Sequence, residues 1–162
     1  MDRGSLLELL SMETGMYVKL QSVLEEESKT VISRDYKSLY AVLADKERVL
    51  AGLSKASAAR SVMVCTMLEK SGYSGQRGLR ALIGLFTGRD KAALQGAADE
   101  LCSALGRVAA MNKSNSLLIS ESLRNLGRSL DFLEAFFVKG TYQATGLVDG
   151  TSLKGSRLRK GV

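Results

Sequence analysis

Apolar residues return at alternating steps of four and three along most of this chain, and no proline interrupts them. A repeat of 3.5 residues is typical of helices that lie along a partner helix in coiled-coil fashion. The repeat occupies positions 6, 10, 13, 17, 20, 24, 27 and 31, and again positions 39, 43, 46, 50, 53, 57, 60, 64 and 67. We therefore predict two long helices, over about residues 5–32 and 35–71, and the short turn between them makes them antiparallel neighbours.

Four positions of this repeat carry charge where an apolar side chain would pack better. The index numbers of Glu27 and Lys46 sum to 73, and those of Glu13 and Arg60 give the same sum. Facing residues of an antiparallel hairpin share a constant index sum, so we predict that both pairs form and help to set the register of the hairpin. The alternative is that all four side chains reach solvent at the edge of the seam.

The rest of the chain continues the helical pattern. Residues 70–78 are rich in glycine and predict a loop, and the apolar residues 79–86 predict a short helix. A last helix is expected over about residues 91–138. The fold class is therefore all-α: an elongated antiparallel helical bundle with a coiled-coil-like hairpin of two long helices, one short helix and one long C-terminal helix. We assign residues 1–138 to this helical bundle domain and residues 139–162 to a flexible basic tail.

The net charge of +6 is concentrated in that tail, where five bases stand against one acid. A basic tail of this kind fits a helical protein that binds nucleic acid or a membrane surface. More often, such a tail simply keeps a protein in solution. The two interpretations stay open on the residues alone, and the first remains an alternative function for the chain.

Composition excludes Cys–His and Ser–His catalysis and the common histidine-containing zinc sites. The chain has no histidine, and Cys65 and Cys102 form no CxxC pair. We expect free thiols, no metal, no cofactor, no small-molecule substrate and no enzymatic activity. No run of about 18 apolar residues is present, so we expect no membrane span. The apolar stretch at the start is too short for a signal peptide, which predicts a cytoplasmic protein.

Residues 117–137 are more apolar than one packed seam requires. About two or three positions in seven suffice for a single seam, whereas this stretch has apolar residues on nearly every side. Either the short helix at residues 79–86 covers the excess, or it forms a surface for an amphipathic helix from another chain. Such a surface also favours a homodimer when no ligand is bound. The candidate binding residues are Leu118, Leu123, Leu126, Leu130, Leu133, Phe136 and Phe137.

The order of these features resembles the FlgN family of flagellar export chaperones. The sequence "MNKSNSLLISESL" is similar to the family's "LN..N..LI" signature and places Asn112, Asn115, Leu118 and Ile119 on its positions, with Met111 where leucine is usual. "TYQATG" (residues 141–146) is similar to the short tyrosine–glycine motif that ends many members. In the first half, Asp35, Leu39, Lys46 and Leu50 follow the family's pattern after the turn. The resemblance covers residues 5 to about 147.

The resemblance implies a chaperone of the flagellar type III export system. Its partners would be the hook-associated (hook–filament junction) proteins, whose carboxy-terminal segment it would bind, and the export apparatus, to which it would deliver them. The family's substrate-binding activity belongs to its carboxy-terminal helical part. We expect Tyr142 to contact the export gate or the substrate, and no nucleic acid to be bound.

Asn112 and Asn115 stand in the apolar stripe of the last helix, between two stretches of different character. A seam asparagine fixes register and partner number at some cost in stability. We interpret the two amides as a hydrogen-bonded register mark at the boundary between a packed seam and the candidate binding surface.

Overall fold

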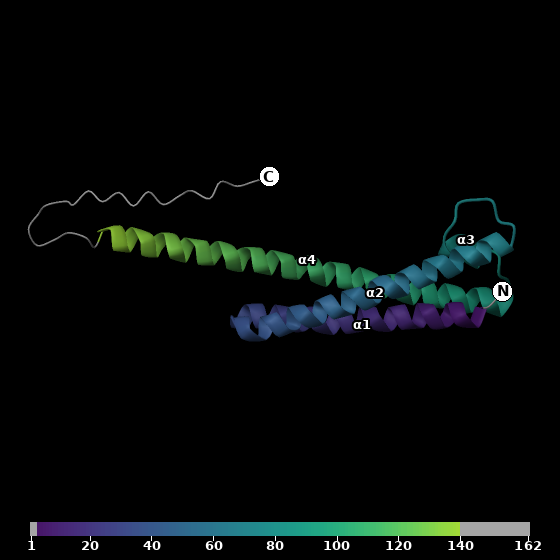
Figure 1. Ribbon diagram of the computed structural model, residues 1–162, viewed down its shortest axis with the longest axis horizontal. Coiled ribbons are helices and arrows are strands. Elements are labelled where there is room, and N and C mark those ends of the chain that lie inside the picture. Colours follow the sequence, from purple (N-terminus) through teal and green to yellow (C-terminus); the bar gives the residue numbers. More distant parts are fainter. Residues whose placement is uncertain (1–2, 140–162) are drawn as a thin grey trace, which may run out of the picture. The chain divides into compact units, whose positions relative to one another are not determined.

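The computed structural model describes residues 3–139, and all regular structure in that range is helical, which confirms the all-α prediction. The helices are α1 (Arg3–Ser33), α2 (Tyr36–Lys70), α3 (Leu79–Gly84) and α4 (Gly88–Lys139) (Figure 1). The short helix ends two residues earlier than expected, and the last begins three residues earlier. The expected basic tail, from residue 140 onward, lies outside the described residues.

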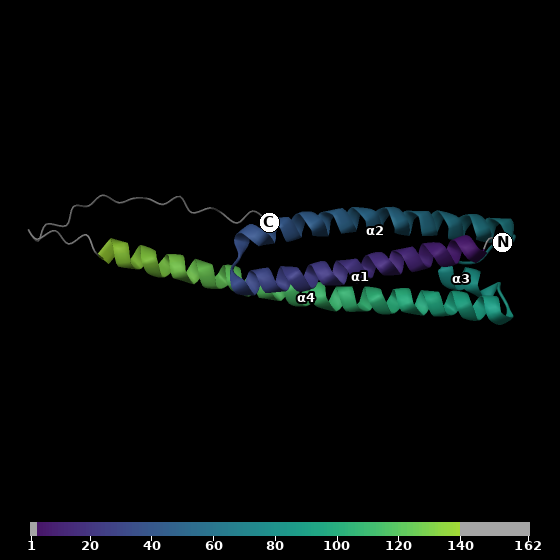
Figure 2. The same ribbon diagram turned by 90° about the horizontal axis from the view of Figure 1, so that it is seen from below.

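The chain divides into two units, Met1–Ser122 and Leu123–Val162. The first unit contains α1, α2, α3 and the beginning of α4. Within it α1 and α2 run antiparallel, and in the view of Figure 2 α1 lies between α2 and α4. An ion pair between Arg3 and Asp90 joins the beginnings of α1 and α4. Of the second unit, the structure describes residues 123–139, which form the last part of α4.

The turn between α1 and α2 is built by two adjacent residues. Arg34 has a φ of 57°, in the left-handed region. Its N–H donates to the Val31 carbonyl, and the Asp35 N–H donates to the Thr30 carbonyl. These two bonds form the Schellman motif that ends many helices. The Asp35 carboxylate then accepts from the Ser38 N–H at 3.1 Å and so caps α2.

Two clusters of buried side chains hold the first unit together. The larger one joins all four helices around a leucine core, and the smaller one lies further along the hairpin. The larger cluster contains Leu6, Leu10, Val64, Met67, Leu68, Leu82, Ile83, Leu94, Ala98 and Leu101. The smaller one contains Leu20, Leu24, Leu53 and Val108.

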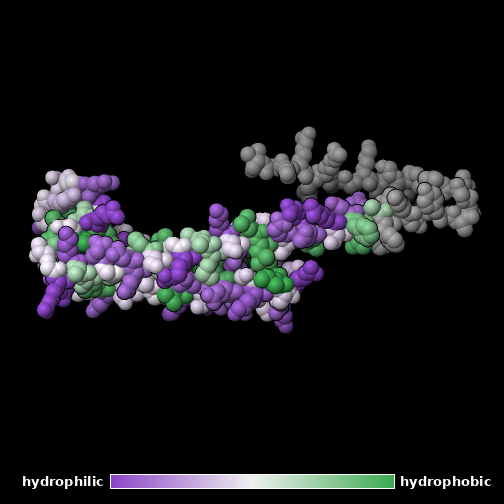
Figure 3. All heavy atoms as spheres, turned by 180° about the vertical axis from the view of Figure 1, so that it is seen from behind, coloured by the Kyte–Doolittle hydropathy of each residue, from purple (hydrophilic) through white to green (hydrophobic). Residues whose placement is uncertain are grey.

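Helix α3 uses its apolar face in the larger cluster, through Leu82 and Ile83. These two buried side chains therefore pack against other residues of the first unit. The alternative in which this helix covers the apolar excess at residues 117–137 does not hold, because most leucines of that stretch, among them Leu123, Leu126 and Leu130, remain exposed. Figure 3 shows hydrophobic side chains interspersed among hydrophilic ones on one face of the molecule.

Candidate functional site

The second unit carries an exposed row of leucines on α4. Leu123, Leu126, Leu130 and Leu133 are between 47% and 64% exposed. Their spacing of three and four residues places them on one face of the helix. We call these four residues the leucine face. This exposed apolar row makes the leucine face the candidate functional site of the second unit.

The other candidate binding residues do not belong to the leucine face. Leu118 is half-buried in the first unit. Phe136 and Phe137 belong to α4, and their side chains lie outside what the structure describes. Tyr142 lies outside the described residues altogether.

Two further apolar residues of this stretch are also exposed. Leu117 is 62% exposed and Phe132 is 71% exposed. Both were part of the apolar excess in the sequence, but neither was among the candidate binding residues. Phe132 is nine residues from Leu123, which at 100° per residue turns it away from the leucine face. The unusually high apolar content of residues 117–137 could have identified both residues, whereas the spacing of three and four residues could not.

A buried carboxylate joins three helices of the first unit. Glu27 of α1 is 1% exposed, and both of its carboxylate oxygens lie 2.9 Å from the Lys46 Nζ of α2. The Asn115 Nδ2 of α4 donates to the Glu27 Oε2 at 2.8 Å and to the Leu24 carbonyl at 2.7 Å. Charge-assisted hydrogen bonds on several sides offset the cost of removing a carboxylate from water.

The two asparagines of the signature differ in their surroundings. Asn115 is 6% exposed and hydrogen-bonded, as described above. Asn112 is exposed and lines a small cavity of about 290 Å³ beside Glu27, Lys46 and Asn115. The expectation that both amides are buried in the seam is therefore wrong for Asn112. One helical turn separates the two residues, and only Asn115 points into the seam.

The second seam pair is also present. Arg60 Nε donates to the Glu13 Oε2 at 2.6 Å, and Arg60 also donates to the Ser57 Oγ at 3.2 Å. Glu13 is 1% exposed, so the alternative in which the seam carboxylates reach solvent is wrong. Burial raises the pKa of the neighbouring Tyr17 above its usual 10.0, the Glu13 carboxylate adds to this, and Arg60 opposes it.

The potential metal-ligating groups among the described residues include carboxylates and two thiols. No group of three or more histidine, cysteine, aspartate or glutamate side chains in residues 3–139 is placed to hold a metal ion. Cys65 is half-buried and Cys102 is exposed, and both thiols are free. None of the described helices is long and apolar enough to cross a membrane.

Residues 3–139 therefore form a helical protein with an ion-paired hairpin and an exposed leucine face. The chain is a member of the FlgN family, because the family model described as FlgN protein matches residues 1–149. The FlgN family consists of flagellar export chaperones. Comparisons with curated proteins and with solved structures gave no match.

Proposed function

We propose that this chain binds the carboxy-terminal segment of a hook-associated protein, keeps that protein unassembled and delivers it to the flagellar export gate. The proposal places the chaperone in the cytoplasm and requires neither a cofactor nor catalysis. Membership of the FlgN family supports the chaperone role. The single observation that carries the choice of site is the exposure of the leucine face.

The physical task of such a chaperone is to cover an apolar helix until it is exported. An amphipathic helix with an uncovered apolar stripe self-associates in water. The leucine face offers a matching stripe, and binding buries both. Leu123, Leu126, Leu130 and Leu133 are the central residues of the proposed interface, and Leu118 is proposed as a further binding residue.

The magnitude of this burial bears on which residues must take part. Burying four leucines that are about half exposed contributes roughly 3–6 kcal/mol before association costs are subtracted. Micromolar affinity corresponds to about 8 kcal/mol of net binding free energy. We therefore include Phe136 and Phe137 in the proposed interface, since aromatic residues contribute most to such contacts.

Tyr142 is proposed as a contact with the export gate or with the substrate. Its position three residues beyond the end of α4 supports a role in handing the complex on, separate from the leucine face. Substitution by phenylalanine and by alanine should reduce delivery, measured as secretion of the hook-associated protein. A Tyr142→Ala variant that secretes normally and binds its substrate normally would remove this residue from the proposal.

The unliganded chain offers the leucine face to a second copy of itself. We propose a homodimer in the absence of substrate, which dissociates when the peptide binds. Analytical ultracentrifugation with and without peptide tests this, and a monomer at all concentrations would contradict it. The chaperone role does not depend on that result.

Calorimetry of the full chain against a hook-associated protein's carboxy-terminal peptide tests the proposed function. The proposal expects heat at tens of micromolar that persists in moderate salt and after deletion of residues 150–162. The alternative function, nucleic-acid or membrane-surface binding through the basic tail, expects binding that falls steeply with salt and disappears with the deletion. No heat with the peptide would contradict the chaperone proposal.

A further inference from the structure

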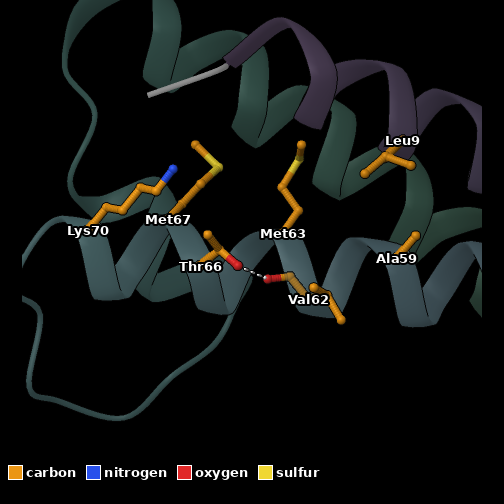
Figure 4. A pocket seen from close by; sticks show the side chains of 7 residues that line it. All are labelled: Leu9, Ala59, Val62, Met63, Thr66, Met67 and Lys70. Atoms are coloured by element: carbon orange, nitrogen blue, oxygen red, sulfur yellow. Dashed lines mark hydrogen bonds between the residues drawn. The ribbon is translucent and has the colours of Figure 1, made fainter.

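The hairpin of the first unit has a second apolar surface, distinct from the leucine face. Leu9 of α1 and six residues of α2 line an open hollow of about 800 Å³. The six are Ala59, Val62, Met63, Thr66, Met67 and Lys70. Figure 4 shows that the side chains of Met63 and Met67 extend from α2 on the side that faces Leu9 of α1. We call this surface the hairpin groove.

The hairpin groove remains accessible because the packed side of α2 faces elsewhere. Val64 and Leu68 pack into the larger core cluster, Met67 lies at its border with the groove, and Val62 is 66% exposed. Ala59 and Thr66 are exposed and small, so another helix can approach the backbone of α2 closely. Methionine side chains such as Met63 adapt their shape to an incoming apolar residue.

The charges around the groove indicate what kind of helix fits it. Lys70 lines one end of the groove, and Lys55 is exposed on the same face of α2, fifteen residues earlier. Neither lysine forms an ion pair within residues 3–139, whereas neighbouring Arg60 and Glu69 both do. At 1.5 Å per residue the two free cations are separated by about 22 Å along the helix axis.

We propose that the hairpin groove docks an amphipathic helix of a second protein that carries an acidic side chain near each end of an apolar stripe of about four turns. The apolar stripe fills the space between Leu9 and Val62, and the two acids pair with Lys55 and Lys70. This docking goes beyond the proposed function, because it uses the first unit and leaves the leucine face free for the export substrate.

The test uses the full chain and a synthetic probe. The probe is a helical peptide of about 20 residues with a leucine stripe and one glutamate near each end, about 15 residues apart. A matched peptide carries lysines in place of the glutamates. Binding of both is measured by fluorescence anisotropy, and circular dichroism verifies that each variant is folded. The variants are Val62→Glu, Thr66→Arg and Lys70→Glu.

Val18→Glu is the matched control, because Val18 is also exposed on the hairpin, at 48%, but does not line the groove. The glutamate peptide should bind, and Val62→Glu and Thr66→Arg should weaken it by about tenfold or more. Lys70→Glu should weaken the glutamate peptide by about fivefold and strengthen the lysine peptide. Val18→Glu and Leu130→Asp should leave both affinities unchanged.

Several results would overturn the inference. They are no binding at about 100 μM, binding that Val62→Glu and Thr66→Arg leave intact, or binding that only Leu130→Asp removes. A wild-type dimer that Val62→Glu converts to a monomer would assign the groove to a second copy of this chain, and would also overturn it. Failure of the groove test leaves the calorimetric test of the leucine face unaffected, so the two can be judged separately.

Discussion

Asn115 of α4 donates a hydrogen bond of 2.8 Å to the carboxylate of Glu27 in α1, although the two residues are 88 positions apart. Lys46 of α2 binds the same carboxylate. One buried acid therefore connects three helices, and it has a cationic partner and an amide partner that come from different elements. These contacts fix the position of α4 along the axis of the α1–α2 hairpin. We propose that Asn115 sets the register of α4 in this way.

Replacing the Asn115 amide should lower the free energy of unfolding markedly, because a buried carboxylate depends on it. In Asn115→Leu the Glu27 carboxylate loses a donor while it stays buried, and we expect a loss of about 1–3 kcal/mol in the free energy of unfolding. Urea denaturation followed by circular dichroism measures the loss. Asn112→Leu is the matched control, because Asn112 is exposed and its substitution should change stability by less than about 0.5 kcal/mol. Equal effects of the two substitutions would contradict this role of Asn115.

The Glu13–Arg60 pair should be far more sensitive to the loss of one partner than to the loss of both. Arg60→Ala leaves Glu13 buried without its cation and should cost about 2–4 kcal/mol, somewhat below the full cost for a dry pair since Arg60 is partly exposed. The double variant Glu13→Leu with Arg60→Leu should unfold within about 1 kcal/mol of the wild type. A double variant as unstable as Arg60→Ala would show that the pair itself, and not the stranded charge, supplies the stability.

Tyr17 should make stability depend on pH in the alkaline range. Its pKa is raised in the folded chain, so the folded state holds the phenolic proton more tightly than the unfolded state does. The stabilisation is present below the unfolded pKa of about 10 and is lost as pH rises toward the folded pKa. Denaturation between roughly pH 9 and 11 should show a steeper loss for the wild type than for Tyr17→Phe. Parallel pH profiles would contradict the raised pKa.

Charged substitutions on the leucine face should remove binding without unfolding the chain. Leu126→Asp and Leu133→Asp replace side chains that are 53% and 47% exposed, so the melting temperature should change little. Binding of the hook-associated peptide should weaken by about tenfold or more, because a carboxylate would be buried in an apolar interface. Asn125→Asp, on a position that is exposed and outside the leucine face, is the control and should bind as the wild type does.

The helices and the charge pairs of the hairpin could be predicted from the sequence. Both follow from the spacing of apolar residues along the chain and from the short turn between the first two helices. The repeat of 3.5 residues predicted α1 and α2, and the shared index sum of the two seam pairs matched the contacts of Glu13 with Arg60 and of Glu27 with Lys46. These relations depend only on the short loop that makes the hairpin antiparallel.

The surroundings of the two asparagines and the apolar excess could not be predicted in the same way. Asn112 and Asn115 both fit a stripe of alternating steps, but the contact with Glu27 is long-range and selects only Asn115. Whether α3 covers residues 117–137 depended on how its short apolar face packs, and Leu82 and Ile83 of that face lie in the larger core cluster. The left-handed conformation of Arg34 at the end of α1 could not be predicted either, since glycine is the usual residue at that position.

The central claim, that the leucine face is where the export substrate binds, is tested most directly by hydrogen–deuterium exchange of the full chain with and without the hook-associated peptide. The account predicts slower amide exchange over residues 118–137 when the peptide is bound, with unchanged exchange in the α1–α2 hairpin. Unchanged exchange over residues 118–137, with new protection in the hairpin at saturating peptide, would contradict it.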